Sequence, residues 1–178
     1  SGVPYSVSAH TTGTNLTRVN GASSAGTAAC ATGFSSKFFT TPTSFDTSLP
    51  CIEFTLTPAA GYSISAESFV AELRRSSSGP ASIRFAYSIN GGASWIDQGT
   101  NQSLANTACG AMTTASWDFT DFSTSVALKF RIYGFNASST SGILQLLNVT
   151  LNGKVCTVSD ADGDGYLAGV DCNDNNPA

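Results

Sequence analysis

Apolar and polar side chains alternate along much of this chain, most sharply in its middle third. Ile52, Phe54 and Leu56 are separated by polar residues, a pattern typical of a strand with one buried face. Further alternating runs occupy residues 68–75, 83–89 and 126–132. Turns rich in Gly, Pro and Asn separate the runs, and no helical pattern interrupts them. We therefore predict an all-β fold: an antiparallel, jelly-roll-like β-sandwich of roughly eight or more strands.

The first fifty residues have weaker periodicity. We expect short strands near Tyr5–Ala9, Asn15–Val19 and Lys37–Thr40. The apolar segment Val3–Val7 is suited to pairing with the sheet edge of a neighbouring module or of another copy of the chain.

Charge is sparse and unevenly placed. Charged residues make up 11% of the chain, and the net charge is −4. Residues 160–178 contain five aspartates and neither Lys nor Arg, so the remainder is nearly neutral. The sequence has no basic patch of the kind that would indicate nucleic-acid binding. It also has no apolar run long enough to span a membrane. We expect one sandwich over residues 1–153 and an Asp-rich calcium loop or linker over 154–178.

The acidic segment has the spacing of a cation-binding loop. Asp160, Asp162 and Asp164 occupy positions 1, 3 and 5 of the loop, Gly165 occupies position 6, and Asp171 occupies position 12. Ca²⁺ prefers oxygen ligands that converge from alternate positions of a tight loop. The carbonyl group of Tyr166 is the candidate ligand at position 7. Asn173 and Asn175 are candidates for a second metal loop that begins at Asp171.

Five cysteines and many Ser, Thr and Gly residues favour an exported protein in an oxidising compartment. Two disulfides among five cysteines can be arranged in many ways, and the sequence does not choose among them. The pairings that we favour are Cys156–Cys172, which would close the Asp loop, and Cys30–Cys51. Cys109 is then free or bonded to another chain.

Two parts of the sequence resemble known families. Residues 54–62, 73–80, 87–95, 129–134 and 147–153 resemble a secreted β-sandwich module of Bacteroidetes-type bacteria. Residues 160–177 are similar to thrombospondin type 3 calcium repeats, in which an Asp-x-Asp-x-Asp-Gly loop runs into Asp-Cys-Asn. The second resemblance implies calcium bound by Asp160, Asp162, Asp164 and Asp171. The first resemblance implies the architecture but no particular function, because such modules accompany enzymes, adhesins and structural repeats alike.

Catalysis is not expected. His10 is the only histidine, so the sequence favours neither a Ser-His-Asp catalytic triad nor a metal site with histidine ligands. Glycan binding is the alternative, since a sugar packs its apolar face on an aromatic ring. Trp95, Trp117 and Tyr133 are the main candidates, and Tyr133 should point away from Phe130 and Ile132.

The sequence therefore predicts a non-catalytic extracellular or cell-surface module with a structural or adhesive role in a larger bacterial protein or filament, stiffened by calcium. Its expected partners are neighbouring modules or copies of itself, and no nucleic acid. The alternative is a carbohydrate-binding module attached to a secreted polysaccharide-degrading enzyme.

Overall fold

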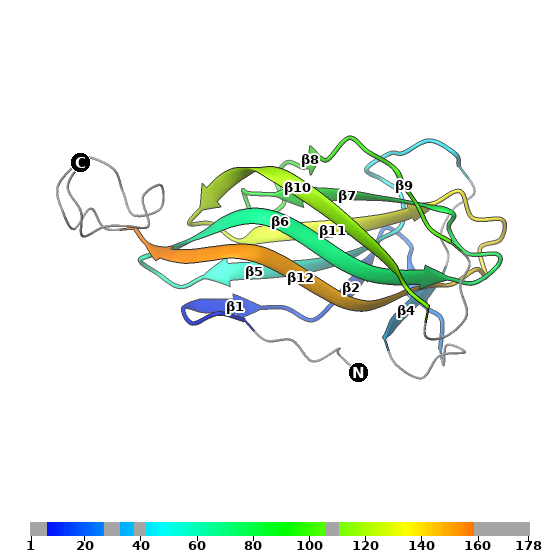
Figure 1. Cartoon of the computed structure of the whole chain (residues 1–178), viewed down its shortest axis with the longest axis horizontal. Helices are drawn as coiled ribbons and strands as arrows, with labels where there is room; N and C mark the ends of the chain where they lie inside the picture. The colour runs from blue at the N-terminus through cyan, green and yellow to red at the C-terminus, as the bar shows by residue number, and fades with distance from the viewer. Residues whose placement is uncertain (1–6, 27–32, 38–41, 106–110, 159–178) are drawn as a thin grey trace.

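Two antiparallel sheets packed face to face form the molecule (Figure 1). The computed structural model describes residues 7–26, 33–37, 42–105 and 111–158, and these ranges contain strands but no helix. The predicted antiparallel β-sandwich is confirmed. Within these ranges the chain therefore contains no helix long and apolar enough to cross a membrane.

The described residues form a seven-stranded and a five-stranded sheet. The seven-stranded sheet contains β1 (Thr11–Gly13), β2 (Thr17–Val19), β5 (Cys51–Pro58), β7 (Ser82–Ser88), β8 (Ile96–Asp97), β9 (Gln102–Ser103) and β11 (Leu128–Phe135). The five-stranded sheet contains β3 (Ser23–Ser24), β4 (Phe34–Lys37), β6 (Tyr62–Arg75), β10 (Thr113–Thr124) and β12 (Leu144–Thr157). The long strands alternate between the sheets along the chain, from β5 to β6, β7, β10, β11 and β12.

The core lies between the sheets and is filled mainly by aromatic rings. The ring centroid of Phe69, from β6, lies 4.5 Å from that of Phe85 on β7 and 5.6 Å from that of Phe130 on β11. Phe85 also stacks on Trp117 of β10, with a centroid distance of 5.0 Å. These side chains come from alternate positions of their strands, which explains the period of two in the sequence.

Some predicted boundaries differ from the structure. Residues 7–10 are not a strand, and β1 begins at Thr11. Of the strand expected at Lys37–Thr40, only Lys37 lies within the described residues, where it belongs to β4. β12 continues past the predicted domain boundary at residue 153, as far as Thr157.

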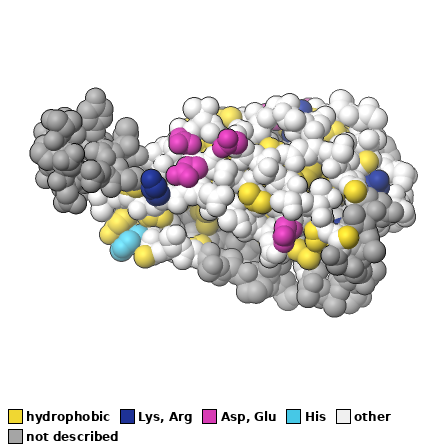
Figure 2. All heavy atoms as spheres, viewed as in Figure 1, with side chains coloured by type: hydrophobic (Ala, Val, Ile, Leu, Met, Phe, Trp, Pro, Cys, Tyr) yellow, Lys and Arg dark blue, Asp and Glu magenta, His cyan; other side chains and the backbone are white. Residues whose placement is uncertain are grey.

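The outer face of the five-stranded sheet is polar but carries few charges (Figure 2). Small side chains bond to one another across its strands; for example, the Asn152 Nδ2 donates to the Ser68 Oγ at 2.9 Å. The seven-stranded sheet is different, because ion pairs join its strands on the outer face.

Candidate functional site

The predicted calcium site lies outside the described residues, as do all of its candidate ligands: Asp160, Asp162, Asp164, Tyr166, Asp171, Asn173 and Asn175. Calcium binding therefore stays a prediction. In the described part of the chain, no group of three or more His, Cys, Asp or Glu residues is placed to hold a metal ion.

Trp117 is not available to a ligand. Its side chain is 4% exposed and packs in the core against Phe69 and Phe85. The prediction of a stacking platform at Trp117 was wrong, because the residue faces the opposing sheet rather than solvent.

Tyr133 is also buried, with no exposed surface. It does point away from Phe130 and Ile132, as its position in the strand predicts. However, the chain before β5 folds over this outer face, and the ring of Phe45 meets that of Tyr133 edge to face at 5.1 Å. Leu49 is part of the same small cluster. The prediction of an exposed Tyr133 was wrong because a covering segment turns this end of the outer face into a second core.

Trp95 is the one candidate platform of the three that stays partly exposed. It follows the β7–β8 turn, where the Oδ1 of Asn90 accepts a hydrogen bond from the Ser94 backbone N–H at 3.0 Å. The Cζ of Arg131 lies 3.9 Å from the centroid of the Trp95 ring, a cation–π contact. The ring is therefore held in place from one side.

Arg131 is itself held by Glu53 on the adjacent strand. The Nε of Arg131 donates to the Glu53 Oε2 at 2.7 Å, and the Nζ of Lys129 lies 3.4 Å from the Glu53 Oε1. The side chains of Glu53 and Arg131 are 12% and 18% exposed. Because all three charges are partly removed from water, their pairing restricts the orientation of the guanidinium under Trp95.

A second ion pair lies on β7 and β8 of the same sheet. The guanidinium of Arg84 forms two hydrogen bonds to the Asp97 carboxylate, and its Nη1 also donates to the Asn101 Oδ1 at 2.9 Å. The hydrogen bond from Arg84 holds the pKa of Asp97 below its usual value. Asp97 therefore stays ionised at neutral pH and serves as a hydrogen-bond acceptor.

We call Trp95, Arg131, Glu53, Lys129, Arg84 and Asp97 the outer-face cluster. Only Trp95 was among the site residues predicted from the sequence. The charged residues were missed because their partners lie on strands that are far apart in the chain and adjacent only in the sheet.

Cys51 lies on this outer face, in the same small cluster as Tyr133, as a free, fully buried thiol. Burial raises its pKa to about 12, so the thiol is protonated at neutral pH. The predicted Cys30–Cys51 disulfide is therefore wrong in this structure: Cys51 packs in the small cluster with Tyr133 and Leu49 instead.

The other cysteine in the described ranges, Cys156, is disulfide-bonded. The predicted Cys156–Cys172 pairing extends outside the described residues and stays a prediction, as does the state of Cys109.

Comparison with known proteins places the chain in no family. No family model matches it, and no curated protein matches it. Among solved structures, the chain is similar to a family two carbohydrate esterase from Cellvibrio japonicus, with 15% identity, a TM-score of 0.34, and coverage of 68% of this chain and 28% of that one. It is also similar to a structure from a study of promiscuous specificity in carbohydrate-binding modules of the β-sandwich superfamily, with 11% identity, a TM-score of 0.32, and coverage of 80% and 56%.

The chain thus spans less than two thirds of either solved protein.

Proposed function

We propose that this chain is a carbohydrate-binding β-sandwich module of a larger secreted or cell-surface protein, and that the outer-face cluster binds the glycan. The observation that supports the proposal is the fixed, partly exposed ring of Trp95, which Arg131 holds from one side while Glu53 orients Arg131. A fixed aromatic ring beside charged hydrogen-bonding groups suits a sugar, which has both an apolar face and hydroxyl groups.

The groups around the ring have complementary roles. The ammonium group of Lys129 has three donors, of which the contact with Glu53 uses one. The carboxylates of Glu53 and Asp97 have lone pairs beyond those that their arginine partners use, so they can accept bonds from hydroxyl groups. Because these side chains are already ordered by their ion pairs, little further conformational entropy is lost on binding.

We propose further that the module has no catalytic activity of its own. Glycoside hydrolysis requires a carboxylic acid with a raised pKa to protonate the leaving group. The pKa of Asp97 moves in the opposite direction because of Arg84, and Glu53 is bound by two cations. The single histidine, His10, stacks on Tyr62 at a centroid distance of 4.0 Å, outside the outer-face cluster.

Replacing Trp95 by alanine should weaken glycan binding by about tenfold, or about 1.4 kcal/mol, because the stacking surface is lost. A glycan array would first identify a sugar class, and titration calorimetry on the best soluble oligosaccharide would then compare the variants. The matched control is Val126→Ala, which also removes an exposed apolar side chain, one that is 51% exposed and outside the cluster. Equal affinities for Trp95→Ala and the unmodified chain would contradict the assignment of the site.

The structural or adhesive role predicted from the sequence is the competing proposal, with neighbouring modules or copies of the chain as partners. A glycan array that shows no binding with or without calcium, together with self-association of the chain, would favour that role over glycan recognition.

We also propose that the C-terminal loop binds Ca²⁺ through Asp160, Asp162, Asp164, Asp171 and the Tyr166 carbonyl group. Without a cation, clustered carboxylates repel one another, so chelation should increase protease cleavage within residues 160–175. Calorimetry with calcium and limited proteolysis with and without chelator are the measurements. Asp162→Asn should weaken calcium binding, whereas Asp174→Asn, outside the predicted first loop, should not. No calcium uptake and unchanged cleavage would exclude the site.

A further inference from the structure

The outer-face cluster carries an excess of positive charge at one end. It contains two carboxylates, Glu53 and Asp97, against three cations, Arg84, Lys129 and Arg131. Three positive charges less two negative ones leave a net charge of +1. Asp97 pairs with Arg84 alone, whereas Glu53 is shared by two cations. Among the described residues, Glu53 is the one carboxylate that pairs with either of them. The excess charge therefore lies beside Glu53, although the chain as a whole carries −4.

Of the two cations that share Glu53, Lys129 keeps more of its bonding capacity for a ligand. The Nε of Arg131 donates to Glu53 at 2.7 Å, whereas the Nζ of Lys129 lies 3.4 Å from the other carboxylate oxygen. The side chain of Lys129 is 30% exposed and that of Arg131 is 18% exposed. Because an ammonium group has three donors, Lys129 can bind a further acceptor from the solvent side while it remains paired with Glu53.

The loop between β7 and β8 brings Lys129 and Trp95 into one site. The Ser88 Oγ accepts a hydrogen bond from the Gly92 N–H at 2.8 Å, which fixes the loop close to Lys129. A Cβ at Gly92 would lie 3.2 Å from the Cδ of Lys129, so the loop backbone packs directly on this side chain. Three residues further along, the Trp95 ring lies on Arg131. Positions 129 and 131 of β11 share one face and are about 7 Å apart, so one sugar residue with its substituents can reach both Lys129 and Trp95.

We propose that the outer-face cluster selects an acidic sugar, a uronate, with its carboxylate on Lys129 and its ring on Trp95. This inference rests on the proposed glycan binding and names the class of glycan. One carboxylate matches an excess of one positive charge, and its oxygens accept charge-assisted hydrogen bonds from the donors that Glu53 leaves free. A neutral sugar leaves the excess charge unmatched, so the cluster discriminates between glycans by charge.

Pairs of ligands that differ only in charge test the proposal. Oligomers of galacturonate, glucuronate and mannuronate are compared by titration calorimetry with their methyl esters, in EDTA so that calcium does not bridge carboxylates. At least one acid should bind about tenfold more tightly than its ester. This preference should shrink as sodium chloride is raised, because salt screens a partly exposed lysine. Equal binding of acid and ester in every pair would overturn the proposal, as would tighter binding of a sulfated oligosaccharide than of any uronate.

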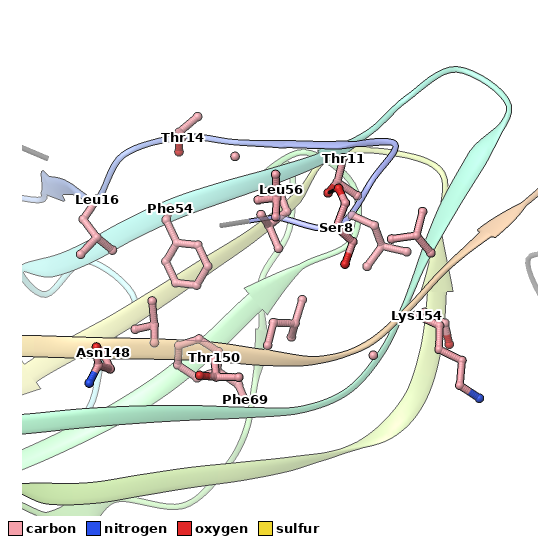
Figure 3. Close-up of a pocket in the computed structure, with 18 of the residues that line it drawn as sticks. Ser8, Thr11, Thr14, Leu16, Phe54, Leu56, Phe69, Asn148, Thr150 and Lys154 are labelled. Carbon is pink, nitrogen blue, oxygen red and sulfur yellow. Dashed lines mark hydrogen bonds between the residues drawn. The ribbon is translucent and has the colours of Figure 1, made fainter. Parts of the chain in front are cut away.

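Variants of two lysines locate the carboxylate. Lys154 on β12 lines a cavity of about 430 Å³ beside β1, which is a second space that a ligand can enter (Figure 3). Lys129→Gln should abolish the preference for the acid, whereas Lys129→Arg, which keeps the charge, should retain it. Lys154→Gln should change the preference by less than about twofold. Loss of the preference in Lys154→Gln but not in Lys129→Gln would place the carboxylate at the cavity and overturn the proposal. Because the readout is the ratio of two affinities within one variant, partial unfolding does not imitate the effect.

The Trp95→Ala variant separates failure of this proposal from failure of the proposed function. If Trp95→Ala weakens the binding of acid and ester alike, and the unmodified chain does not prefer the acid, glycan binding stands and selection by charge is refuted. If Trp95→Ala binds every sugar as tightly as the unmodified chain, the proposed function is refuted and the selection of uronates at this site is refuted with it.

Discussion

Replacing Phe85 by alanine is expected to lower the free energy of unfolding by about 4 kcal/mol. Phe85 has no exposed surface, and its ring centroid lies 4.5 Å from that of Phe69 and 5.0 Å from that of Trp117. Phe119 and Phe130 also lie within 5.8 Å of it, centroid to centroid. The substitution therefore leaves a cavity at the point where both sheets contribute aromatic side chains. Since domains of this kind are stable by only about 5–15 kcal/mol, much of the total would be lost.

Urea unfolding followed by tryptophan fluorescence measures this effect. Phe85→Leu keeps most of the side-chain volume and should cost clearly less than Phe85→Ala. Val126→Ala, at a 51% exposed position, should change stability by less than about 0.5 kcal/mol. If Phe85→Ala cost no more than Val126→Ala, Phe85 would not hold the central position that the structure assigns to it.

Replacing Glu53 by leucine is expected to destabilise the fold by about 2 kcal/mol. The carboxylate is the shared partner of Arg131 and Lys129, so its removal leaves two cations partly buried without their counter-charge. The expected cost is below that of breaking a fully buried pair, because 12% of the Glu53 side chain and 18% of the Arg131 side chain are exposed and water screens the charges. Arg131 also loses the contact that orients it under Trp95, so the glycan binding that we propose for this site should weaken in parallel.

A double-mutant cycle distinguishes the ion pair from simple packing. Arg131→Met alone should also destabilise, whereas the Glu53→Leu and Arg131→Met double variant should lose clearly less than the sum of the two. Replacing both partners removes the uncompensated charge at this pair, which is the source of most of the cost. Additive effects would show that Glu53 and Arg131 are not energetically coupled.

The strands of the sandwich were predictable where one face of a strand is apolar and the other is polar. Phe69, Ala71 and Leu73 occupy alternate positions of β6, and all three are fully buried. Ile83 and Phe85 follow the same rule on β7. Side-chain direction in a strand follows directly from position, so such runs indicate both the element and its buried face.

The outer face of the seven-stranded sheet was not predictable in this way. Tyr133 has the expected direction, yet it is buried because Phe45 and Leu49 lie over it. Cys51 is a free thiol in the same buried cluster, so it does not form the expected disulfide with Cys30 in this structure. Whether a second layer covers an outward face depends on where a long loop packs, and no local period encodes that.

The sequence by itself determined the class of the fold, the core-facing positions of the main strands and, through the 1-3-5-6-12 spacing of its acidic segment, the calcium prediction. All of these depend on residues close together in the chain. Only the tertiary structure decided that Trp95 remains partly exposed while Trp117 and Tyr133 do not, and that Glu53 meets Arg131. The physical reason is that exposure and charge pairing depend on which strands become neighbours and which segments cover them, and both are set by contacts between residues far apart in sequence.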